Sequence, residues 1–299
     1  MQQLPRAEDL SETYTTARAG LTVRKMTHHI GAEIDGVDLS KPLSDEQFQD
    51  INDTLVTHSV IVLRDQDLPP KMHVEFSSRF GRLVGHVVKR FGLEEYPEVT
   101  LISNVVNEKG EKIGADRAGM IWHSDMSYIQ RPVLGSMLYG VECPTEGANT
   151  EFASMFAAHD ALSDDMRERL AGLRGVHDYA WHYATYLTHR PPLTDEEKAK
   201  TPPVTHPALR THPVSGRRAI YLGEGLTRTI EGMDDAEGRK LVVEVSDFAT
   251  QPQFVYSHKW RVGDLVMWDN RSAMHRATEF DNSQRRLMRR TTVEGDIPF

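Results

Sequence analysis

The sequence predicts a mostly β protein, a β-sandwich of jelly-roll type (the double-stranded β-helix) with helical inserts packed outside. Many short β-rich runs are separated by Gly and Pro turns, which is typical of sandwiches and barrels. The runs do not alternate regularly with helices, which disfavours a doubly wound parallel sheet. The length of 299 residues fits one such domain, because all-β folds often run this long.

The chain is expected to divide into a short arm and one domain. Residues 1–20 mix acidic and polar side chains and are expected to form a flexible N-terminal arm. Residues 21–299 show no internal repeat or low-complexity segment. They are expected to form a single domain with one large core.

The first third of this domain combines three strands with two helices. The expected strands are LTVRKM (21–26), AEIDGVDL (32–39) and VIVLRD (60–65). Ser44 signals the start of a helix before the third strand. Phe48, Ile51 and Leu55 recur in it at spacings of three and four, which predicts one buried face. A second helix is expected over residues 70–80.

From residue 98 onward the pattern is mostly that of strands. The expected strands are EVTLIS (98–103), MIWHSDMSYI (120–129), SMLYGVE (136–142), TEFASM (150–155), RAIYLG (218–223), FVYSHKW (254–260), DLVMWDN (264–270) and RLMRRTTV (286–293). Two helices, near 157–173 and 234–250, are expected to interrupt them and to pack outside the barrel.

Two neighbouring segments stand apart from this pattern. Residues 190–207 are rich in proline with a charged centre, which predicts a solvated loop that could act as a lid. The preceding residues 177–190 are crowded with aromatic side chains and histidines. Trp181, Tyr183 and Tyr186 could form the wall of a pocket for an aromatic ring, and ordinary packing is an equal alternative.

The composition excludes several classes of function. The formal net charge is −9 and no basic run is present, so neither nucleic acid nor an anionic membrane surface is an expected partner. No apolar stretch approaches the roughly 18 residues of a membrane span. Cys143 is the only cysteine, so an intrachain disulfide is impossible. Together with an N-terminus that lacks an apolar signal region, these features favour a cytoplasmic enzyme.

A candidate metal site lies in the segment Trp122-His123-Ser124-Asp125. In an extended chain, residues i and i+2 point to the same side, so His123 and Asp125 can face one ion. His275, just past the strand 264–270, is the natural third ligand. Two histidines and one carboxylate form a facial triad that leaves three positions open on Fe(II). A His-x-Asp pair alone is common by chance, so the prediction depends on its context.

That context is an arginine-rich strand that follows His275. If QRRLMRRTTV is a strand, Arg286 and Arg290 share one face, while Arg285 and Arg289 share the other. An arginine that faces into a barrel is costly unless an anion pairs with it. Two inward arginines therefore suggest two anions, a cosubstrate carboxylate and an acid group of the substrate. The alternative is that both are solvated strand residues.

These residues belong to a set of motifs that spans roughly residues 21–297. The motifs are GAEIDGVDL, FSSRFGRL, LISN, WHSDMSY, GANTEF, THPVSGR, GDLVMWDNR, MHRA and RRLMRR. In them the chain resembles the taurine and 2,4-dichlorophenoxyacetate dioxygenases, a family of Fe(II)/2-oxoglutarate enzymes. Arg286 follows His275 by eleven residues, as the family's arginine does. THPVSGR, WRVGDLVMWDNR and Lys89 are closer to the 2,4-dichlorophenoxyacetate branch.

The resemblance assigns a role to each candidate residue. It implies that His123, Asp125 and His275 bind Fe(II). It implies that Arg286 binds the distal carboxylate of 2-oxoglutarate and that Thr150 adds a hydroxyl hydrogen bond. The family's usual Gly-Gly-Asp-Thr reads Gly-Ala-Asn-Thr here, and the threonine is kept.

The resemblance also implies a substrate site. Arg290 matches the position that holds the substrate's acid group in the taurine enzyme. His86 and Lys89 match positions that border the substrate, although a solvated loop is nearly as good an interpretation of both. The expected partners are a small anionic substrate and O₂, and a homo-oligomer is expected.

The expected reaction is 2-oxoglutarate-dependent hydroxylation of a small organic acid. An aryloxyalkanoate, cleaved at its ether link with release of succinate and CO₂, is the first expectation. A taurine or alkylsulfonate dioxygenase is the alternative. Two alternatives from other classes are a zinc hydrolase and a non-catalytic metal-binding jelly roll. A zinc hydrolase needs a general base beside the metal and leaves Arg286 and Thr150 unexplained.

Overall fold

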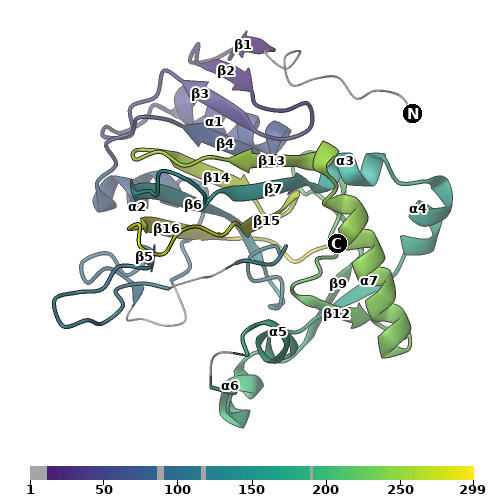
Figure 1. The fold of residues 1–299 in the computed structure, drawn as a ribbon. Helices are drawn as coiled ribbons and strands as arrows, with labels where there is room; N and C mark the ends of the chain where they lie inside the picture. Colours follow the sequence, from purple (N-terminus) through teal and green to yellow (C-terminus); the bar gives the residue numbers. More distant parts are fainter. Residues whose placement is uncertain (1–11, 86–90, 116–118, 189–190) are drawn as a thin grey trace.

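The computed structural model describes residues 12–85, 91–115, 119–188 and 191–299 (Figure 1). An eight-stranded sheet forms the larger layer. In order across the sheet its strands are β1 (Thr13–Thr15), β2 (Thr22–Lys25), β3 (Ala32–Asp35), β4 (Val60–Leu63), β14 (Leu265–Asp269), β6 (Val133–Glu142), β16 (Leu287–Glu294) and β5 (Thr100–Ser103). Its neighbouring strands pair antiparallel, except that β3 and β4 run parallel.

A second, smaller sheet packs against the larger one. Its strands, in order, are β13 (Val255–His258), β7 (Thr150–Ser154) and β15 (Ala273–Ala277), all antiparallel. The buried side chains between the two sheets include Phe152 from β7, Tyr256 from β13, and Val266 and Trp268 from β14. Two antiparallel sheets packed face to face give the predicted jelly-roll class, which is confirmed.

Helices cover the outer face of the larger sheet. They are α1 (Asp45–His58) and α2 (Pro70–Ser78). Leu265 and Met267 of β14 contribute to the core cluster on this outer side, while the alternate residues of β14 face the smaller sheet. β14 is buried along its whole length because both of its faces are covered. Ser44 caps α1 as predicted, in a capping box with Gln47.

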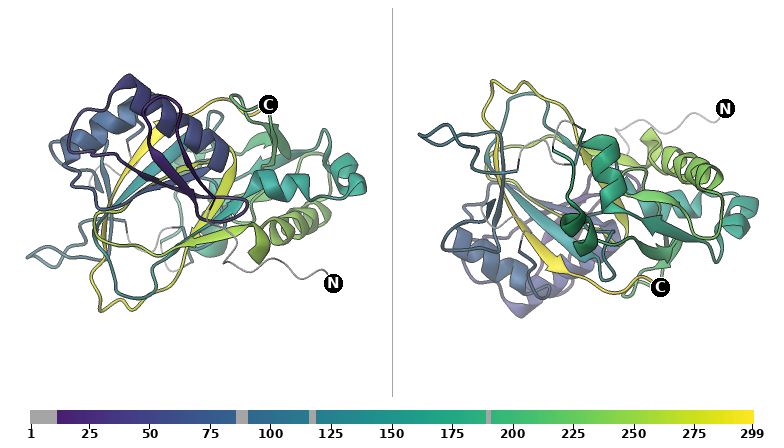
Figure 2. Two further views of the ribbon diagram at one scale, coloured as in Figure 1. Left: turned by 90° about the horizontal axis from the view of Figure 1, so that it is seen from above. Right: turned by 90° about the horizontal axis from the view of Figure 1, so that it is seen from below.

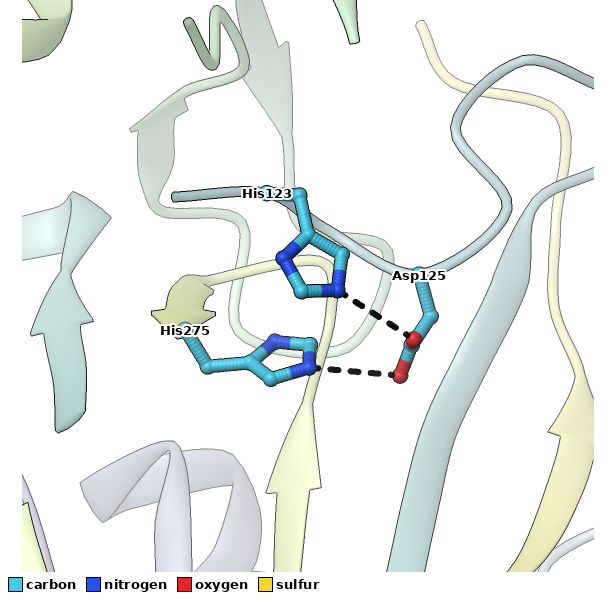
Figure 3. Close-up of side chains that lie close together, drawn as sticks. All are labelled: His123, Asp125 and His275. Carbon is cyan, nitrogen blue, oxygen red and sulfur yellow. Dashed lines mark ion pairs between the residues drawn. The ribbon is translucent and has the colours of Figure 1, made fainter. Parts of the chain in front are cut away.

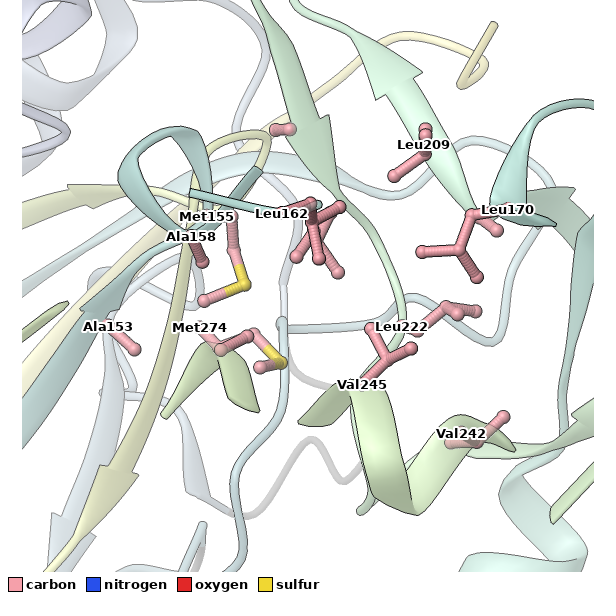
Figure 4. Packing of buried hydrophobic residues seen from close by; sticks show 14 of the residues in the cluster. Ala153, Met155, Ala158, Leu162, Leu170, Leu209, Leu222, Val242, Val245 and Met274 are labelled. Carbon is pink, nitrogen blue, oxygen red and sulfur yellow. The ribbon is translucent and has the colours of Figure 1, made fainter. Parts of the chain in front are cut away.

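Beyond the smaller sheet lies a third group of elements, which forms a separate core cluster (Figure 4). Its helices are α3 (Met155–Asp160), α4 (Asp164–Leu170), α7 (Asp235–Ala249) and the 3₁₀ turn η3 (Pro252–Phe254). Its strands are β8 (Arg174–His177), β9 (Val204–Pro207), β10 (Leu209–Thr211), β11 (Arg218–Ile220) and β12 (Thr227–Ile230). Met274 of β15 joins this cluster, so β15 links it to the jelly roll. Figure 2 shows α1 and α2 on the side of the molecule opposite α7.

The structure corrects the expected N-terminal arm. Residues 1–11 of the arm lie outside the described residues, but Thr13–Thr15 form β1 and pair with β2. The following turn is fixed because the Asp50 carboxylate accepts hydrogen bonds from the backbone of Arg18 and Ala19 and from the Arg18 guanidinium. This end of the chain is therefore an edge strand of the sheet.

Four further features differ from what the sequence predicted. Residues 120–129 form a turn-rich segment, in which Met126 has a φ of 52°, and His123 alone makes a β-bridge. The aromatic stretch begins a helix, α5 (Tyr179–Tyr186), because the Asp178 side chain caps the backbone of Trp181. The predicted loop 190–207 contains α6 (Asp195–Lys200), capped by Thr194, and ends in β9. The single helix predicted near 157–173 is two helices, because Ser163 caps a new one.

Across the described ranges, no helix is long and apolar enough to pass through a membrane.

Candidate active site

His123, Asp125 and His275 converge at one end of the smaller sheet (Figure 3). His275 lies in the middle of β15, opposite Phe152 of β7. His123 is held beside it by two backbone hydrogen bonds, from His123 N to His275 O at 3.1 Å and from His275 N to His123 O at 2.9 Å. This bridge fixes the two imidazole centroids 4.2 Å apart.

The carboxylate of Asp125 faces both imidazoles. Its Oδ1 lies 3.7 Å from His123 Nε2, and its Oδ2 lies 3.7 Å from His275 Nε2. One ligand atom from each residue lies within 4.8 Å of the other two, so a single ion could contact all three. Two imidazoles and one carboxylate on one side of an ion leave its other positions open, which suits Fe(II) with a bound cosubstrate.

The protonation states suit metal binding. His123 Nδ1 lies 2.8 Å from the Ile121 carbonyl, which can only accept, so Nδ1 carries the proton and Nε2 presents its lone pair. Burial lowers the pKa of His275 to about 3, which keeps this imidazole neutral. Burial alone would raise the pKa of Asp125, but His275, Arg290, His123 and a hydrogen bond from Ser136 together hold it well below its usual value. All three are therefore in the form that a cation needs.

Arg286 lies at a separate cavity of about 150 Å³. The cavity is lined by Ser103, Asn104, Ala115, Met120, Ala148, Ala277, Thr278, Glu279, Phe280, Asn282 and Arg286. Ala277 follows His275 by two residues on β15 and pairs with Thr150 of β7. Thr150 is not among the lining residues, but its hydroxyl oxygen accepts a hydrogen bond from Trp260 Nε1 at 3.0 Å. The hydroxyl proton of Thr150 can then be donated to an anion.

Arg290 is the arginine beside the metal ligands. Its Nη1 lies 3.5 Å from Asp125 Oδ1, and 22% of its side chain is exposed. The alternation of β16 sends Arg289 to the opposite face, where it donates to the Leu68 carbonyl. Arg285 is on the surface and pairs with Glu142 through two hydrogen bonds. Of the four arginines, Arg286 and Arg290 therefore lie at the candidate site. Arg285 and Arg289 do not.

The expected substrate residues are only partly visible. His86 and Lys89 lie outside the described residues. In the aromatic stretch, Trp181 and Tyr186 pack against each other and against Arg239 of α7. Tyr179 packs on Tyr128 with a centroid distance of 4.7 Å and an angle of 34° between the ring planes.

Tyr128 follows Asp125 by three residues in the same turn-rich segment. Burial raises the pKa of Tyr128, and Tyr179 and the charge of Asp125 raise it further. Tyr128 and Tyr179 were missed in the sequence. The signal for Tyr128 was its position three residues after Asp125, and Tyr179 was overlooked in favour of the larger aromatic cluster that follows it.

Two further contacts of Asp125 were also missed. The Ser136 hydroxyl donates to Asp125 Oδ2 at 2.8 Å, and Asn270 Oδ1 accepts from the Asp125 backbone N–H at 3.0 Å. Asn270 belongs to the motif GDLVMWDNR, which was the available signal. Ser136 carried none, because it reads as an ordinary strand residue of SMLYGVE.

Comparison with known proteins decides the family. The family described as "Taurine catabolism dioxygenase TauD, TfdA family" matches residues 22–292. The chain belongs to the TauD/TfdA family. An alpha-ketoglutarate-dependent 2,4-dichlorophenoxyacetate dioxygenase of Burkholderia sp. (strain RASC) is 36% identical over 272 residues, which cover 88% of this chain and 91% of the relative.

Two other relatives agree with this family. An (S)-phenoxypropionate/alpha-ketoglutarate-dioxygenase of Sphingobium herbicidovorans is 31% identical over 280 residues, which cover 89% of this chain and 92% of the relative. The crystal structure of AAD-2 in complex with Mn(II) and N-oxalylglycine matches with a TM-score of 0.80 and 34% identity, covering 93% of this chain and 98% of that chain.

The TauD/TfdA protein is therefore an Fe(II)- and 2-oxoglutarate-dependent dioxygenase. The His-Asp-His cluster fits Fe(II) by the chemistry of its donors, and Arg286 lines a cavity where its guanidinium could pair with a carboxylate. The family membership therefore rules out the two alternatives from other classes, the zinc hydrolase and the non-catalytic metal-binding module.

Proposed function

We propose that this dioxygenase hydroxylates a small organic acid, and that its substrate class is the aryloxyalkanoates. The observation that carries the substrate class is the position of Arg290 beside Asp125, together with Tyr128, which follows Asp125 by three residues and packs on Tyr179 at 4.7 Å. An arginine in a partly closed site favours an anionic substrate, since a neutral one would leave its charge unpaired. The aromatic pair offers the face on which an aryl ring can stack.

We infer the following roles for the site residues. His123, Asp125 and His275 hold Fe(II), and the geometry of their donor atoms supports this assignment. Arg286 and Thr150 bind the distal carboxylate of 2-oxoglutarate. Iron and 2-oxoglutarate supply the oxidising chemistry when bound, while the protein orients the reactants and excludes water.

The proposed reaction inserts one oxygen atom at the carbon between the ether oxygen and the carboxylate. The second atom of O₂ enters succinate, and the C1 carboxylate of 2-oxoglutarate leaves as CO₂. The hydroxylated product is a hemiacetal, so its bond to the aryl oxygen breaks and the hydroxyl proton passes to that oxygen. Phenoxyacetate would thus give phenol and glyoxylate. Arg290 would hold the carboxylate throughout and so place this carbon near the metal.

The second candidate is a taurine or alkylsulfonate dioxygenase. Arg290 can pair with a sulfonate as well as with a carboxylate. The aromatic pair favours the aryloxy acids, because an aliphatic sulfonate gains less from a stacking surface. His86 and Lys89 are proposed to border the substrate, which the family resemblance alone supports.

The test is succinate release with phenoxyacetate, 2,4-dichlorophenoxyacetate and taurine. We expect the aryloxy acids to be turned over and Arg290→Gln to raise their KM by roughly tenfold or more, as expected for a lost charge-assisted pair. Arg285→Gln, two residues before the same strand but paired with Glu142 at the surface, is the matched control and should behave as wild type. Efficient turnover of taurine with none of the aryloxy acids would overturn the substrate class.

The metal ligands are tested separately. Anaerobic addition of Fe(II) and 2-oxoglutarate should give a weak visible charge-transfer band, which His123→Ala, Asp125→Ala and His275→Ala should each abolish. A variant that keeps the band and near wild-type turnover would remove that residue from the ligand set.

We also propose that the enzyme works in the cytoplasm as a homo-oligomer. The single, half-buried Cys143 supports a location where disulfides are not needed, and the family resemblance supports the oligomer. Light scattering after size-exclusion chromatography tests the second point, and a monomer at micromolar concentration would contradict it.

A further inference from the structure

Two neutral side chains hold Asp125, one from β6 and one from the turn after β14. Ser136 of β6 donates its hydroxyl to Oδ2 at 2.8 Å. Asn270, which directly follows β14, accepts the Asp125 backbone N–H at 3.0 Å and places its Nδ2 3.5 Å from the same Oδ2. Ser136 and Asn270 are 0% and 1% exposed, so water does not compete for these contacts.

Asp125 needs such support because of where it sits. It belongs to a turn, and the next residue, Met126, has a left-handed φ of 52°. His275, by contrast, is fixed by strand pairing on β15, and His123 by the β-bridge to it. Of the three ligands, Asp125 is therefore the one whose orientation is not set by strand pairing. Hydrogen bonds to a ligating carboxylate orient it and raise its affinity for the metal.

Asn270 is itself held by a buried cluster of charges. Its backbone N–H donates to the Leu134 carbonyl at 2.8 Å. The preceding Asp269, at 0% exposure, accepts two hydrogen bonds from the Arg271 guanidinium, at 2.8 Å and 2.6 Å. It also lies 3.0 Å from His212 Nε2. The turn that carries Asn270 is thus fixed by an ion pair that water does not reach.

The protonation of His212 completes this cluster. Its Nδ1 accepts from the backbone N–H groups of Val214 and Ser215, at 3.3 Å and 3.1 Å, so Nε2 carries the proton that faces Asp269. The motifs THPVSGR and WDNR, which lie far apart in the chain, therefore meet in one network. The network ends at the metal ligand.

We propose that Ser136 and Asn270 are positioning residues for the metal, and that the His212–Asp269–Arg271 cluster positions Asn270. The proposal deepens the proposed function, since it rests on Asp125 being a ligand. Neither residue touches the substrate or the metal. Their effect is on how tightly the metal is bound, because a carboxylate that can rotate loses part of its interaction with the ion.

The experiment measures the affinity of the folded protein for Mn(II) by calorimetry, with 2-oxoglutarate present. Ser136→Ala and Asn270→Ala are expected to weaken Mn(II) binding by roughly ten- to a hundredfold, as is common when a supporting hydrogen bond to a ligand is lost. The matched control is Ser77→Ala. Ser77 is also 0% exposed, and its hydroxyl bonds within the core to the His73 carbonyl and to Thr291 rather than to Asp125. It is expected to lower thermal stability while Mn(II) affinity stays at the wild-type value.

Asn270→Asp separates the two contacts of Asn270. It keeps an oxygen for the Asp125 N–H but replaces the amide NH₂ with a second negative charge beside Oδ2. We expect its Mn(II) affinity and the visible spectrum of its Co(II) form to differ from those of wild type. This variant also tests the proposal if Asn270→Ala does not fold.

The outcomes are distinct. Unchanged Mn(II) affinity in Ser136→Ala and in the Asn270 variants would overturn the proposal, and so would an equal loss in Ser77→Ala, because the effect would then be general loosening. Selective loss of affinity supports it. If the protein does not turn over aryloxy acids, the proposed substrate class is overturned. A selective loss of Mn(II) affinity in the same protein would still support the positioning roles of Ser136 and Asn270.

Discussion

At the scale of single residues, the chemistry depends on how charge is distributed around Asp125. Arg290 lies 3.5 Å from this carboxylate, and its guanidinium carries five N–H donors. It can therefore remain beside Asp125 while other donors bind the acid group of a substrate. The proposed anchor for the substrate is thus held in place before the substrate arrives, which would lower the entropic cost of binding.

Arg286→Gln is expected to weaken 2-oxoglutarate binding much more than metal binding. A charge-assisted pair contributes about 1.5–3 kcal/mol, so the apparent affinity for 2-oxoglutarate should fall roughly ten- to a hundredfold. Arg286→Lys should restore only part of this, because lysine lacks the planar fork. The measurement is succinate release against 2-oxoglutarate concentration. An unchanged dependence would shift the role to Arg285, Arg289 or Arg290.

Gly119→Ala is expected to disturb His123. Gly119 has a φ of +75°, and a Cβ placed there would lie 2.9 Å from His123 Cε1. An alanine at this position would strain the backbone, and its Cβ would displace the His123 imidazole. We expect weaker Mn(II) binding with a fold that circular dichroism cannot distinguish from wild type. Gly110→Ala is a suitable control, because it has a similar φ of +78° but an open surrounding. Equal Mn(II) affinity in both variants would contradict the prediction.

Residues with local chemical signals could be predicted from the sequence, and residues without them could not. His123 and Asp125 are two positions apart, and Arg286 follows His275 at a fixed spacing, so a short motif contains them. Asn270 reaches Asp125 from 145 residues away, and its role exists only after the strands have paired. No pattern of residue types along the chain encodes that contact.

At the scale of elements, strands were predicted correctly where hydrophobic residues are continuous. The prediction failed where helix caps and tertiary contacts determine the secondary structure. β4 and β14 read as strands because they are continuous runs of apolar residues, VIVL in β4 and LVMW in β14. The segment 120–129 looks equally apolar, yet only His123 pairs, with β15. α5 was missed because its aromatic residues conceal a helix that Asp178 caps.

Arg239→Met is expected to loosen α5. The Arg239 guanidinium donates to the carbonyls of Glu224 and Thr227 and to the Tyr186 hydroxyl, and it stacks on Trp181 at 4.7 Å. Methionine keeps much of the apolar stem but none of these polar contacts. We expect faster amide hydrogen exchange across α5 and a several-fold higher KM for the acid substrate, because Tyr179 begins this helix.

The control for this element is Arg169→Met. Arg169 also pairs with a residue of α7, since its Nη1 lies 3.4 Å from Glu244 Oε2, but this pair is exposed at the surface. In this control variant, amide hydrogen exchange across α5 and the KM for the acid substrate should stay near the wild-type values. Unchanged exchange in Arg239→Met would show that α5 is held by its other contacts.

At the scale of the whole molecule, buried histidines make the fold sensitive to acid. Burial lowers the pKa of His58 and His206 to about 4 and that of His73 to about 3, and it lowers the pKa of His177 well below its usual value. In the unfolded chain these groups titrate near 6.5. The unfolded state therefore binds more protons between pH 6.5 and about 4.

The metal-free protein is thus expected to lose stability as the pH falls below 6.5. Each such histidine adds a slope that approaches about 1.4 kcal/mol per pH unit, and the stability it contributes is complete above pH 6.5. Urea unfolding at pH 7.5, 6.5 and 5.5 measures the free energy of unfolding. His206→Gln should reduce the slope by about one proton, while the same change at the exposed His28 should not. A free energy of unfolding that is flat over this range would contradict the prediction.

The fold class could be predicted because the strands of a jelly roll appear in the sequence as many short apolar runs. The third group of elements, α3 to β12 and α7, could be predicted only in part. β8, β9, β10 and β12 are three or four residues long and gain their order from the cluster around Leu222, Val242 and Val245. Strands this short depend on packing partners that the local sequence does not reveal.

The position of α5 has a practical consequence for altering this enzyme. The His-Asp-His cluster is built on strands with covered faces and fixed turns, whereas no residue of α5 is fully buried. A library of variants confined to residues 179–186 should therefore change which acids are accepted while most members still fold and bind metal. Directed evolution of this catalyst toward a new aromatic acid could begin at Tyr179 and leave His123, Asp125 and His275 untouched.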